Sequence, residues 1–146
     1  MKISTKGRYA LRLMIDIAKY GKDSNVSLKD ASKRQGISLK YLEQIVMLLS
    51  KDGLLVSRRG SQGGDRIAKD PKLITVSEIL RVTEGSMAPV ACLDDEVNKC
   101  KRVSSCPTIK LWEGLYDAVM TYLDNVTLDD LVSHAGDSSD NLCEDI

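Results

Sequence analysis

The pattern of apolar and polar positions along the chain predicts a mainly helical protein. Residues 5–20 form the first predicted helix, because apolar residues recur there at helical spacing. Gly21 is a typical stop just beyond its end. The apolar side consists of Tyr9, Ala10, Leu13, Met14, Ile17 and Ala18, and the polar stripe of Arg8, Arg12, Asp16 and Lys19.

Two shorter helices follow and together form a helix-turn-helix pattern. The first starts at Ser27, which forms a possible capping box with Asp30, and it ends near Gly36. The second is capped by Ser38 and ends at Gly53. Its expected buried residues are Leu42, Ile45, Val46 and Leu49, and its exposed ones are Lys40, Glu43, Gln44, Met47 and Lys51. The pattern alone is a weak signal, because many helical hairpins share it.

A β-hairpin directly after this helix pair makes the pattern more specific. Residues 54–57 and 66–68 are predicted to be strands, and the segment between them contains three glycines within five residues. A hairpin in this position is the wing of a winged helix. The expected fold class is therefore mainly α with a small β-hairpin wing (α+β), a winged helix-turn-helix.

The second half of the chain predicts a long helix joined to the first half by an irregular loop. Thr75 and Glu78 form a capping box for a fourth helix ending near Gly85. Residues 86–105 have no helical or strand period. Pro107 suits the first turn of a helix that runs to about Asn125 and exceeds what a small winged domain needs for its own core. Its apolar stripe consists of Trp112, Leu115, Tyr116, Val119 and Leu123, which predicts a partner helix from a second subunit.

Four segments follow from these elements. They are a DNA-binding domain at 1–85, a cysteine-containing loop at 86–106, a dimerisation helix with a short following helix at 107–133, and a disordered acidic tail at 134–146. The short helix starts where Thr127 precedes Asp130 by three residues.

Charge separates the chain into two halves although the formal net charge is zero. Residues 1–70 carry 15 Lys/Arg against 7 Asp/Glu, a net +8, and residues 71–146 carry 6 against 14, a net −8. Such a basic half suggests a polyanionic partner, although an acidic tail added by chance would also produce the asymmetry. No apolar stretch reaches membrane-spanning length and no signal peptide is present, so a cytoplasmic protein is expected.

The basic half offers candidate contacts to DNA. A helix fits the major groove, where Gln pairs with adenine and Glu accepts from cytosine. Arg59 in the wing could enter a minor groove, and Arg58 could contact phosphate. The candidate DNA-binding residues are Ser38, Lys40, Tyr41, Glu43, Gln44, Arg58, Arg59 and Gly60. The alternative for either feature alone is an ordinary solvated surface.

Three cysteines lie close together in the irregular loop, at Cys92, Cys100 and Cys106. Their spacing differs from the C-x2-C pairs of structural zinc sites, and an iron–sulfur cluster normally needs four ligands. Cys143 is a weak candidate for the fourth place, and His134 is expected to be a surface residue. Nearby oxygens come from Asp94, Asp95 and Glu96. Three thiols without a metal are the alternative.

Several segments resemble the IscR/CymR-type (Rrf) family of regulators over roughly residues 1–133. They are residues 1–10, 37–44, 58–64, 111–112 and 125–131. The resemblance implies a homodimeric winged-helix repressor or activator that binds partly palindromic promoter DNA through Ser38, Tyr41, Glu43, Gln44 and Arg59. It also implies that Cys92, Cys100 and Cys106 hold a [2Fe–2S] cluster, as in the cluster-sensing branch of the family, which responds to iron–sulfur or redox status.

The chain departs from that family pattern at two positions. Ile109 stands where the cluster-sensing branch has a histidine ligand, and the first cysteine interval is longer, so a [4Fe–4S] cluster sensing nitric oxide is an alternative. Asp65 replaces a usual aromatic after Gly63-Gly64, which would put an acid near the wing and weaken its contact with DNA.

A second hypothesis for the function is a CymR-like repressor of cysteine or sulfur metabolism that has no cluster and is controlled by a partner enzyme. An enzyme is the weakest reading, because no nucleophile–base pair is evident.

Overall fold

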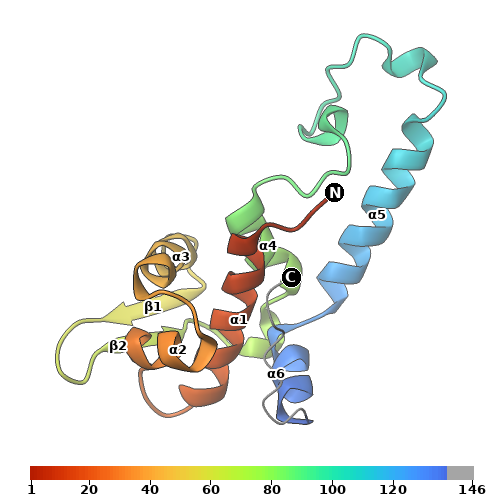
Figure 1. The fold of residues 1–146 in the computed structure, drawn as a ribbon. Coiled ribbons are helices and arrows are strands. Elements are labelled where there is room, and N and C mark those ends of the chain that lie inside the picture. Colours follow the sequence, from red (N-terminus) through yellow and green to blue (C-terminus); the bar gives the residue numbers. More distant parts are fainter. Residues whose placement is uncertain (138–146) are drawn as a thin grey trace.

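The computed structural model describes residues 1–137 and confirms the expected winged helix-turn-helix architecture (Figure 1). Its helices are α1 (Thr5–Tyr20), α2 (Leu28–Gln35), α3 (Leu39–Lys51), α4 (Val76–Glu84), α5 (Ile109–Asn125) and α6 (Leu128–Asp137). The wing is the hairpin of β1 (Leu55–Arg58) and β2 (Gly64–Ile67). Three short 3₁₀ turns complete the order: η1 (Pro71–Leu73), η2 (Ala91–Leu93) and η3 (Val103–Ser105).

Side-chain caps explain where several helices begin. The Ser38 hydroxyl accepts from the Tyr41 amide at 3.2 Å and starts α3. Thr75 and Glu78 form the predicted capping box, with bonds of 2.8 and 3.2 Å, and start α4. The predicted box at Ser27 is wrong, since that residue is the N-cap of α2 but makes no side-chain capping bond.

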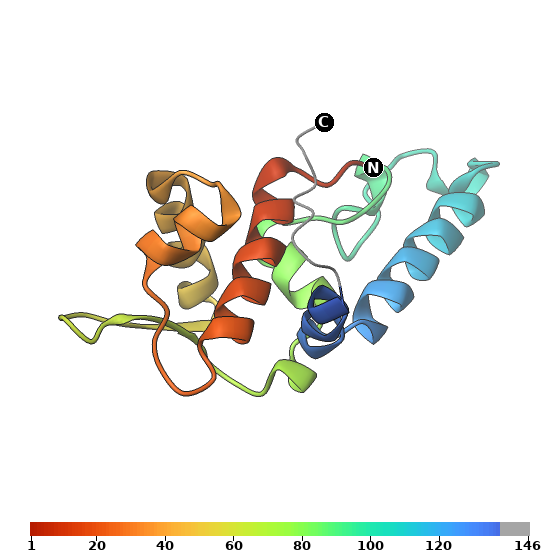
Figure 2. The ribbon, with the colours of Figure 1, turned by 60° about the horizontal axis from the view of Figure 1, so that its bottom comes forward.

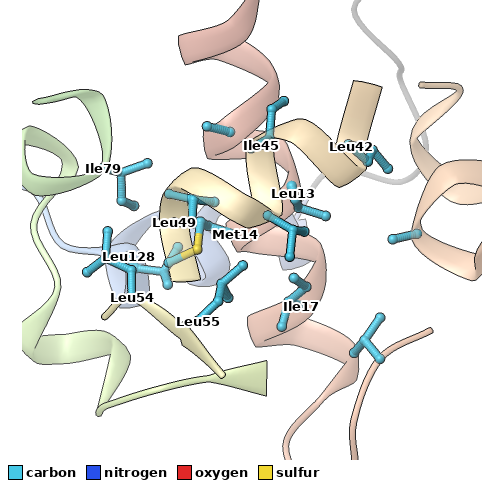
Figure 3. Packing of buried hydrophobic residues seen from close by; sticks show 14 of the residues in the cluster. Leu13, Met14, Ile17, Leu42, Ile45, Leu49, Leu54, Leu55, Ile79 and Leu128 are labelled. Atoms are coloured by element: carbon cyan, nitrogen blue, oxygen red, sulfur yellow. The ribbon is translucent and has the colours of Figure 1, made fainter. Parts of the chain in front are cut away.

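The core is aliphatic and centres on α1 (Figure 3). Leu13, Met14 and Ile17 are at most 1% exposed and pack with Leu42, Ile45 and Leu49 of α3. The periodicity of both helices predicts these faces correctly. Ile79 of α4, Leu128 of α6 and Ala31 of α2 belong to the same cluster, so five helices share one interior.

Short backbone bonds fasten the C-terminal helices to this core. The Leu128 amide donates to the Ile74 carbonyl at 2.8 Å, and the Val76 amide donates to the Val126 carbonyl at 2.9 Å. Helix α6 continues to Asp137, four residues into the segment 134–146 that was expected to be a tail. Residues 138–146, with Cys143, lie outside the described part of the chain.

The sequence pattern placed Asp16 in the polar stripe of α1, but the structure shows that this prediction is wrong. Its side chain is fully buried and pairs with Arg34 of α2 at 2.7 Å. A buried carboxylate is tolerated only when it is paired and hydrogen-bonded, and the partner here lies 18 residues further along the chain. The helical period of α1 alone could not reveal that partner.

The wing is tied to the segment before α2 as well as to α3. Val26 and Asp65 exchange two backbone hydrogen bonds of 2.8 Å, which adds a third short strand segment to the hairpin. Gly64 has φ of +139°, and a Cβ there would lie 2.5 Å from the Val26 carbonyl oxygen. A glycine is therefore required at this close approach.

The Asp65 side chain points into the protein and away from any DNA that the wing could contact. It is 5% exposed and accepts a hydrogen bond from Ser57, whose oxygen lies 3.5 Å from that of Ser50 at the end of α3. The expected weakening of DNA contact by an exposed acid is thus not supported by its position. Burial raises the pKa of Asp65, while the bond from Ser57 opposes that rise.

We predict that Asp65→Asn changes how folding stability depends on pH. Because the folded-state pKa of Asp65 is raised, the wild-type protein loses stability as pH rises above the ordinary aspartate pKa through the folded value. The variant lacks this loss, so the variant should gain stability relative to the wild type between pH 4 and 7. Urea unfolding across that range measures the difference, with the exposed Asp23→Asn as control. A gap that is constant or shrinks with rising pH contradicts the prediction.

Candidate DNA-binding surface and cysteine loop

The N-terminal part of α3 presents polar side chains to solvent, whereas Met47, which is 72% exposed, interrupts this face further along the helix. Lys40, Glu43 and Gln44 are exposed on the side opposite the buried Leu42 and Ile45. Together with the exposed Ser38, these residues are four of the predicted DNA-binding residues, and they lie near the N-terminal end of one helix. This is the end from which side chains reach base edges when a helix enters a major groove.

Tyr41 differs from its neighbours on α3 because its ring is half-buried. It meets the Tyr9 ring of α1 edge to face, with ring centres 5.6 Å apart and planes at 88°. Aromatic pairs favour this arrangement. The ring is therefore fixed against the scaffold and only partly exposed.

The wing places its arginines at the tip of the hairpin. Arg58 ends β1 and pairs with Gly64, whereas Arg59 and Gly60 belong to the exposed turn. The Gly63 amide donates to the Gly60 carbonyl at 2.9 Å, and Asn25 donates to the Gln62 carbonyl at 3.1 Å. These bonds hold the turn while Arg58 and Arg59 form no ion pair with any residue in the described range 1–137.

The hairpin and α3 lie on the same side of α1 (Figure 1). Figure 2 shows this side at one end of the molecule, with α5 at the opposite end. The basic half of the sequence, residues 1–70, contains α1, α2, α3 and the wing, whereas α4, α5 and α6 belong to the acidic half.

The cysteine loop between α4 and α5 contains η2 and η3 and is otherwise irregular. Cys92 and Cys106 are half-buried and Cys100 is exposed. No three Cys, His, Asp or Glu side chains within residues 1–137 are grouped so that they could hold a metal ion. The three thiols have the right chemistry for iron, but their arrangement in this structure does not form a site.

Cys106 stands at the entrance to α5. Hydrogen bonds from the Thr108 hydroxyl, at 3.5 Å, and from the backbone amides of Thr108 and Ile109 hold the pKa of its thiol below the usual value. The thiolate is the form that binds metals. Ile109 is 8% exposed as the first residue of α5, so it fills a packing position and offers no ligand.

The carboxylates and the histidine around the loop do not gather at the thiols. Asp94 accepts from Ser86 at 2.5 Å, and Asp95 pairs with Lys99 at 2.7 Å. Glu96 is exposed, as is His134 on α6. Cys143 lies outside the described residues.

Helix α5 has two apolar faces, of which one is covered. Met120, Tyr116 and Leu123 pack with Val76 and Leu80 of α4. The helix starts after Pro107, with Thr108 as its N-cap, so the proline precedes the first turn and does not belong to it.

The second apolar face of α5 is exposed. Leu111 is 61%, Leu115 39% and Tyr122 70% exposed, and their spacing of four and seven residues puts them on one stripe. The predicted stripe contained Leu115 but missed Leu111 and Tyr122, which the same helical period could have found. No helix in the described chain is long and apolar enough to cross a membrane.

Comparison with known proteins identifies the family. The family model Rrf2, described as an iron-dependent transcriptional regulator, matches residues 3–134. The HTH-type transcriptional regulator IscR of Yersinia pseudotuberculosis is 39% identical over 134 residues, which cover 92% of this chain and 80% of that protein.

Two solved structures share the fold. CymR (YrzC), the global cysteine regulator of B. subtilis, has a TM-score of 0.75 and 39% identity, with 92% of this chain and 98% of that one covered. The IscR of T. potens has a TM-score of 0.75 and 35% identity, with 97% and 94% covered. The family and these relatives are transcriptional regulators and not enzymes. The resemblance read from the sequence is therefore confirmed, and this chain belongs to the Rrf2 family of transcriptional regulators.

Proposed function

We propose that this protein is a homodimeric regulator that binds partly palindromic promoter DNA with α3 in the major groove and the wing in the neighbouring minor groove. The observation that carries the proposal is the exposed face of α3 on the same side of α1 as the wing, whose Arg58 and Arg59 form no ion pair within residues 1–137. Membership of a family of transcriptional regulators supports it. Because the proposed target is promoter DNA, the proposal implies a cytoplasmic protein.

Each candidate residue has a role that follows from its chemistry and position. Gln44 and Glu43 are exposed one turn into α3 and suit adenine and cytosine edges. Lys40 suits phosphate, as does Arg58 at the base of the turn. Arg59 and Gly60 lie in the exposed turn of the wing, where Arg59 would enter the minor groove and Gly60 would let the backbone approach. Ser38 and Tyr41 support this surface, since both are already engaged within the protein.

The second subunit covers the exposed stripe of Leu111, Leu115 and Tyr122. The 17 residues of α5 span about 25 Å. An uncovered apolar stripe of this length on a soluble helix marks an interaction surface. Pairing of α5 with its copy would place two α3 helices on one duplex, and half-sites about 34–36 Å apart would be read together.

The signal that controls the regulator is proposed to be an iron–sulfur cluster on Cys92, Cys100 and Cys106. Three thiols in one loop and the similarity to proteins named IscR support this proposal. Such a cluster would supply a centre that responds to iron, redox status or nitric oxide. In this structure the thiols stand apart, so binding would require the loop to close around the cluster.

A cluster-free regulator is the alternative, and two observations favour it. A solved relative is named the global cysteine regulator, and residues 1–137 contain no gathered metal site, with Ile109 offering no fourth ligand. In that case a metabolic enzyme that binds the regulator would provide the control.

We predict that Gln44→Ala and Arg59→Ala weaken operator binding by different means. An operator can be selected from random duplexes with the wild-type protein and its affinity measured by fluorescence anisotropy at several salt concentrations. Gln44→Ala should lose about 1–3 kcal/mol on the operator and little on unrelated DNA, since a base contact is removed. Arg59→Ala should weaken both and lower the salt slope by about 1. Lys72→Ala, in η1, is the control for loss of a surface charge. If a variant that combines Gln44→Ala and Arg59→Ala keeps its full affinity for the operator, the assignment of these two residues is contradicted.

We predict that Leu115→Glu combined with Tyr122→Glu yields a folded monomer. Two carboxylates in an apolar interface would be buried without partners, which costs several kcal/mol. Sedimentation equilibrium measures the mass, and circular dichroism checks the fold. Thr121→Glu is the matched control, because that residue is exposed on α5 but lies off the stripe. A dimeric double variant would refute the proposed interface.

We predict that replacement of any one of Cys92, Cys100 and Cys106 by Ala abolishes cluster binding, whereas Cys143→Ala leaves it unchanged. Iron, acid-labile sulfide and visible absorbance are measured after anaerobic reconstitution. Loss of one thiolate removes a ligand that no described neighbour replaces. Wild-type protein that takes up no iron would exclude the cluster and leave the cluster-free regulator.

A further inference from the structure

A hydrogen-bonded cluster joins α1 to the end of α2, and no part of the proposed DNA contact uses it. The Asp16 carboxylate is completely buried at its centre. Arg34 donates to both of its oxygens, at 2.9 and 2.7 Å, and Gln35 donates to one of them at 2.9 Å. The bond with Asp16 raises the pKa of Arg34. Paired charge-assisted bonds of this kind fix orientation as well as distance.

The cluster extends to the turn of the helix-turn-helix. Arg12 donates to the Gln35 side chain at 3.2 Å and also to the Gln35 backbone carbonyl. Gln35 is the last residue of α2, and Gly36 at φ +64° follows it. Ser32 donates at 2.5 Å to the Ile37 carbonyl on the far side of the turn. The turn that aims α3 is therefore held from α1 by side chains, in addition to its own backbone bonds.

Two aromatic contacts connect this cluster to the first turn of α3. The Arg12 guanidinium lies 5.3 Å from the centre of the Tyr9 ring, a cation–π distance. The Tyr9 ring in turn meets Tyr41, which is next to Lys40 and three residues before Gln44. Asp16, Arg12 and Tyr9 thus touch both ends of the segment that runs from the end of α2 to the start of α3.

We propose that Asp16 and Arg12 are positioning residues for operator recognition, which set the orientation of α3 although they lie outside its DNA-facing surface. This inference rests on the proposed function. Base contacts require side chains to be held within about 0.5 Å and 10–20° of the productive geometry. The Arg34 side chain is 31% exposed, but the Asp16 carboxylate is fully buried. A buried charge in an ion pair adds little net stability compared with an apolar replacement, so a role in fixing geometry is the stronger explanation for its presence.

Loss of the contacts made by Asp16 and Arg12 should reduce affinity for the operator more than non-specific affinity for DNA. Phosphate contacts tolerate small rotations of α3 because charge acts over a Debye length. Hydrogen bonds to base edges do not, since they weaken steeply with angle. The measured quantity is therefore the ratio of operator affinity to affinity for an unrelated duplex of equal length, which a purely stabilising role would leave unchanged in folded protein.

The test uses Asp16→Asn and Arg12→Lys in the full chain. Arg12→Lys keeps the charge but loses the planar fork, so a change cannot come from a lost phosphate cation. Asp23→Asn, an exposed residue after α1, controls for the loss of one negative charge. Ile79→Val controls for lower stability, since Ile79 is buried in α4 and takes no part in the cluster. All variants are measured well below their melting temperatures.

We expect both test variants to lower the affinity ratio about tenfold, through weaker operator binding, while both controls keep the wild-type ratio. An unchanged ratio in Arg12→Lys, with or without a lower melting temperature, overturns the proposal. Should Asp16→Asn fail to fold, Arg12→Lys decides alone. Failure of the wild-type protein to select any operator from random duplexes would instead refute the proposed function itself, so the two failures are distinguishable.

Discussion

Burial of one side of α1 against α3, α4 and α6 is the interaction on which the rest of the structure depends. Leu13, Met14 and Ile17 supply its inner face, and each such side chain contributes roughly 1.5–3 kcal/mol when removed from water. The chain has no Phe, so the surrounding residues are also aliphatic. Because α3 and the wing both attach to this scaffold, the geometry of the exposed surface is determined by a core that lies behind it (Figure 3).

Two buried carboxylates interrupt this apolar interior, and each joins elements that are distant in sequence. Asp16 links α1 to α2, and Asp65 accepts from Ser57 across the hairpin and, through its backbone, links the wing to Val26. Apolar contacts are not directional, so they allow small rotations between helices. Directional bonds at these two positions restrict such rotations around the helix-turn-helix and the wing.

The features that depend on local sequence could be predicted, and those that depend on distant partners could not. The helical period identified the buried face of α3, and the residues at Ser38 and Thr75 identified real caps. Asp16 looked like a surface residue because its partner belongs to another helix. Asp65 looked exposed for the same reason, since the close approach of Val26 is a tertiary contact.

The DNA-facing residues could be proposed from residue type and helix position, but the arrangement of the cysteines could not be obtained in this way. The loop from residue 86 to 106 has no period from which distances follow, and its bonds are local. Helix α5 shows the opposite case. Its covered and exposed faces both obey one helical period, and only packing on α4 decides which face remains for a partner.

Residues 1–70, with a net charge of +8, form α1, α2, α3 and the wing, whereas residues 71–137 carry 6 Lys/Arg against 11 Asp/Glu and include α4, α5 and α6. The subunit therefore has a dipole despite its zero net charge. In the field of a duplex such a molecule would experience a torque that turns its basic half toward the phosphates before contact. The same dipole favours head-to-tail association between free molecules at low ionic strength. Near the isoelectric point of about 6.6, the protein should therefore be more soluble in added salt than in dilute buffer.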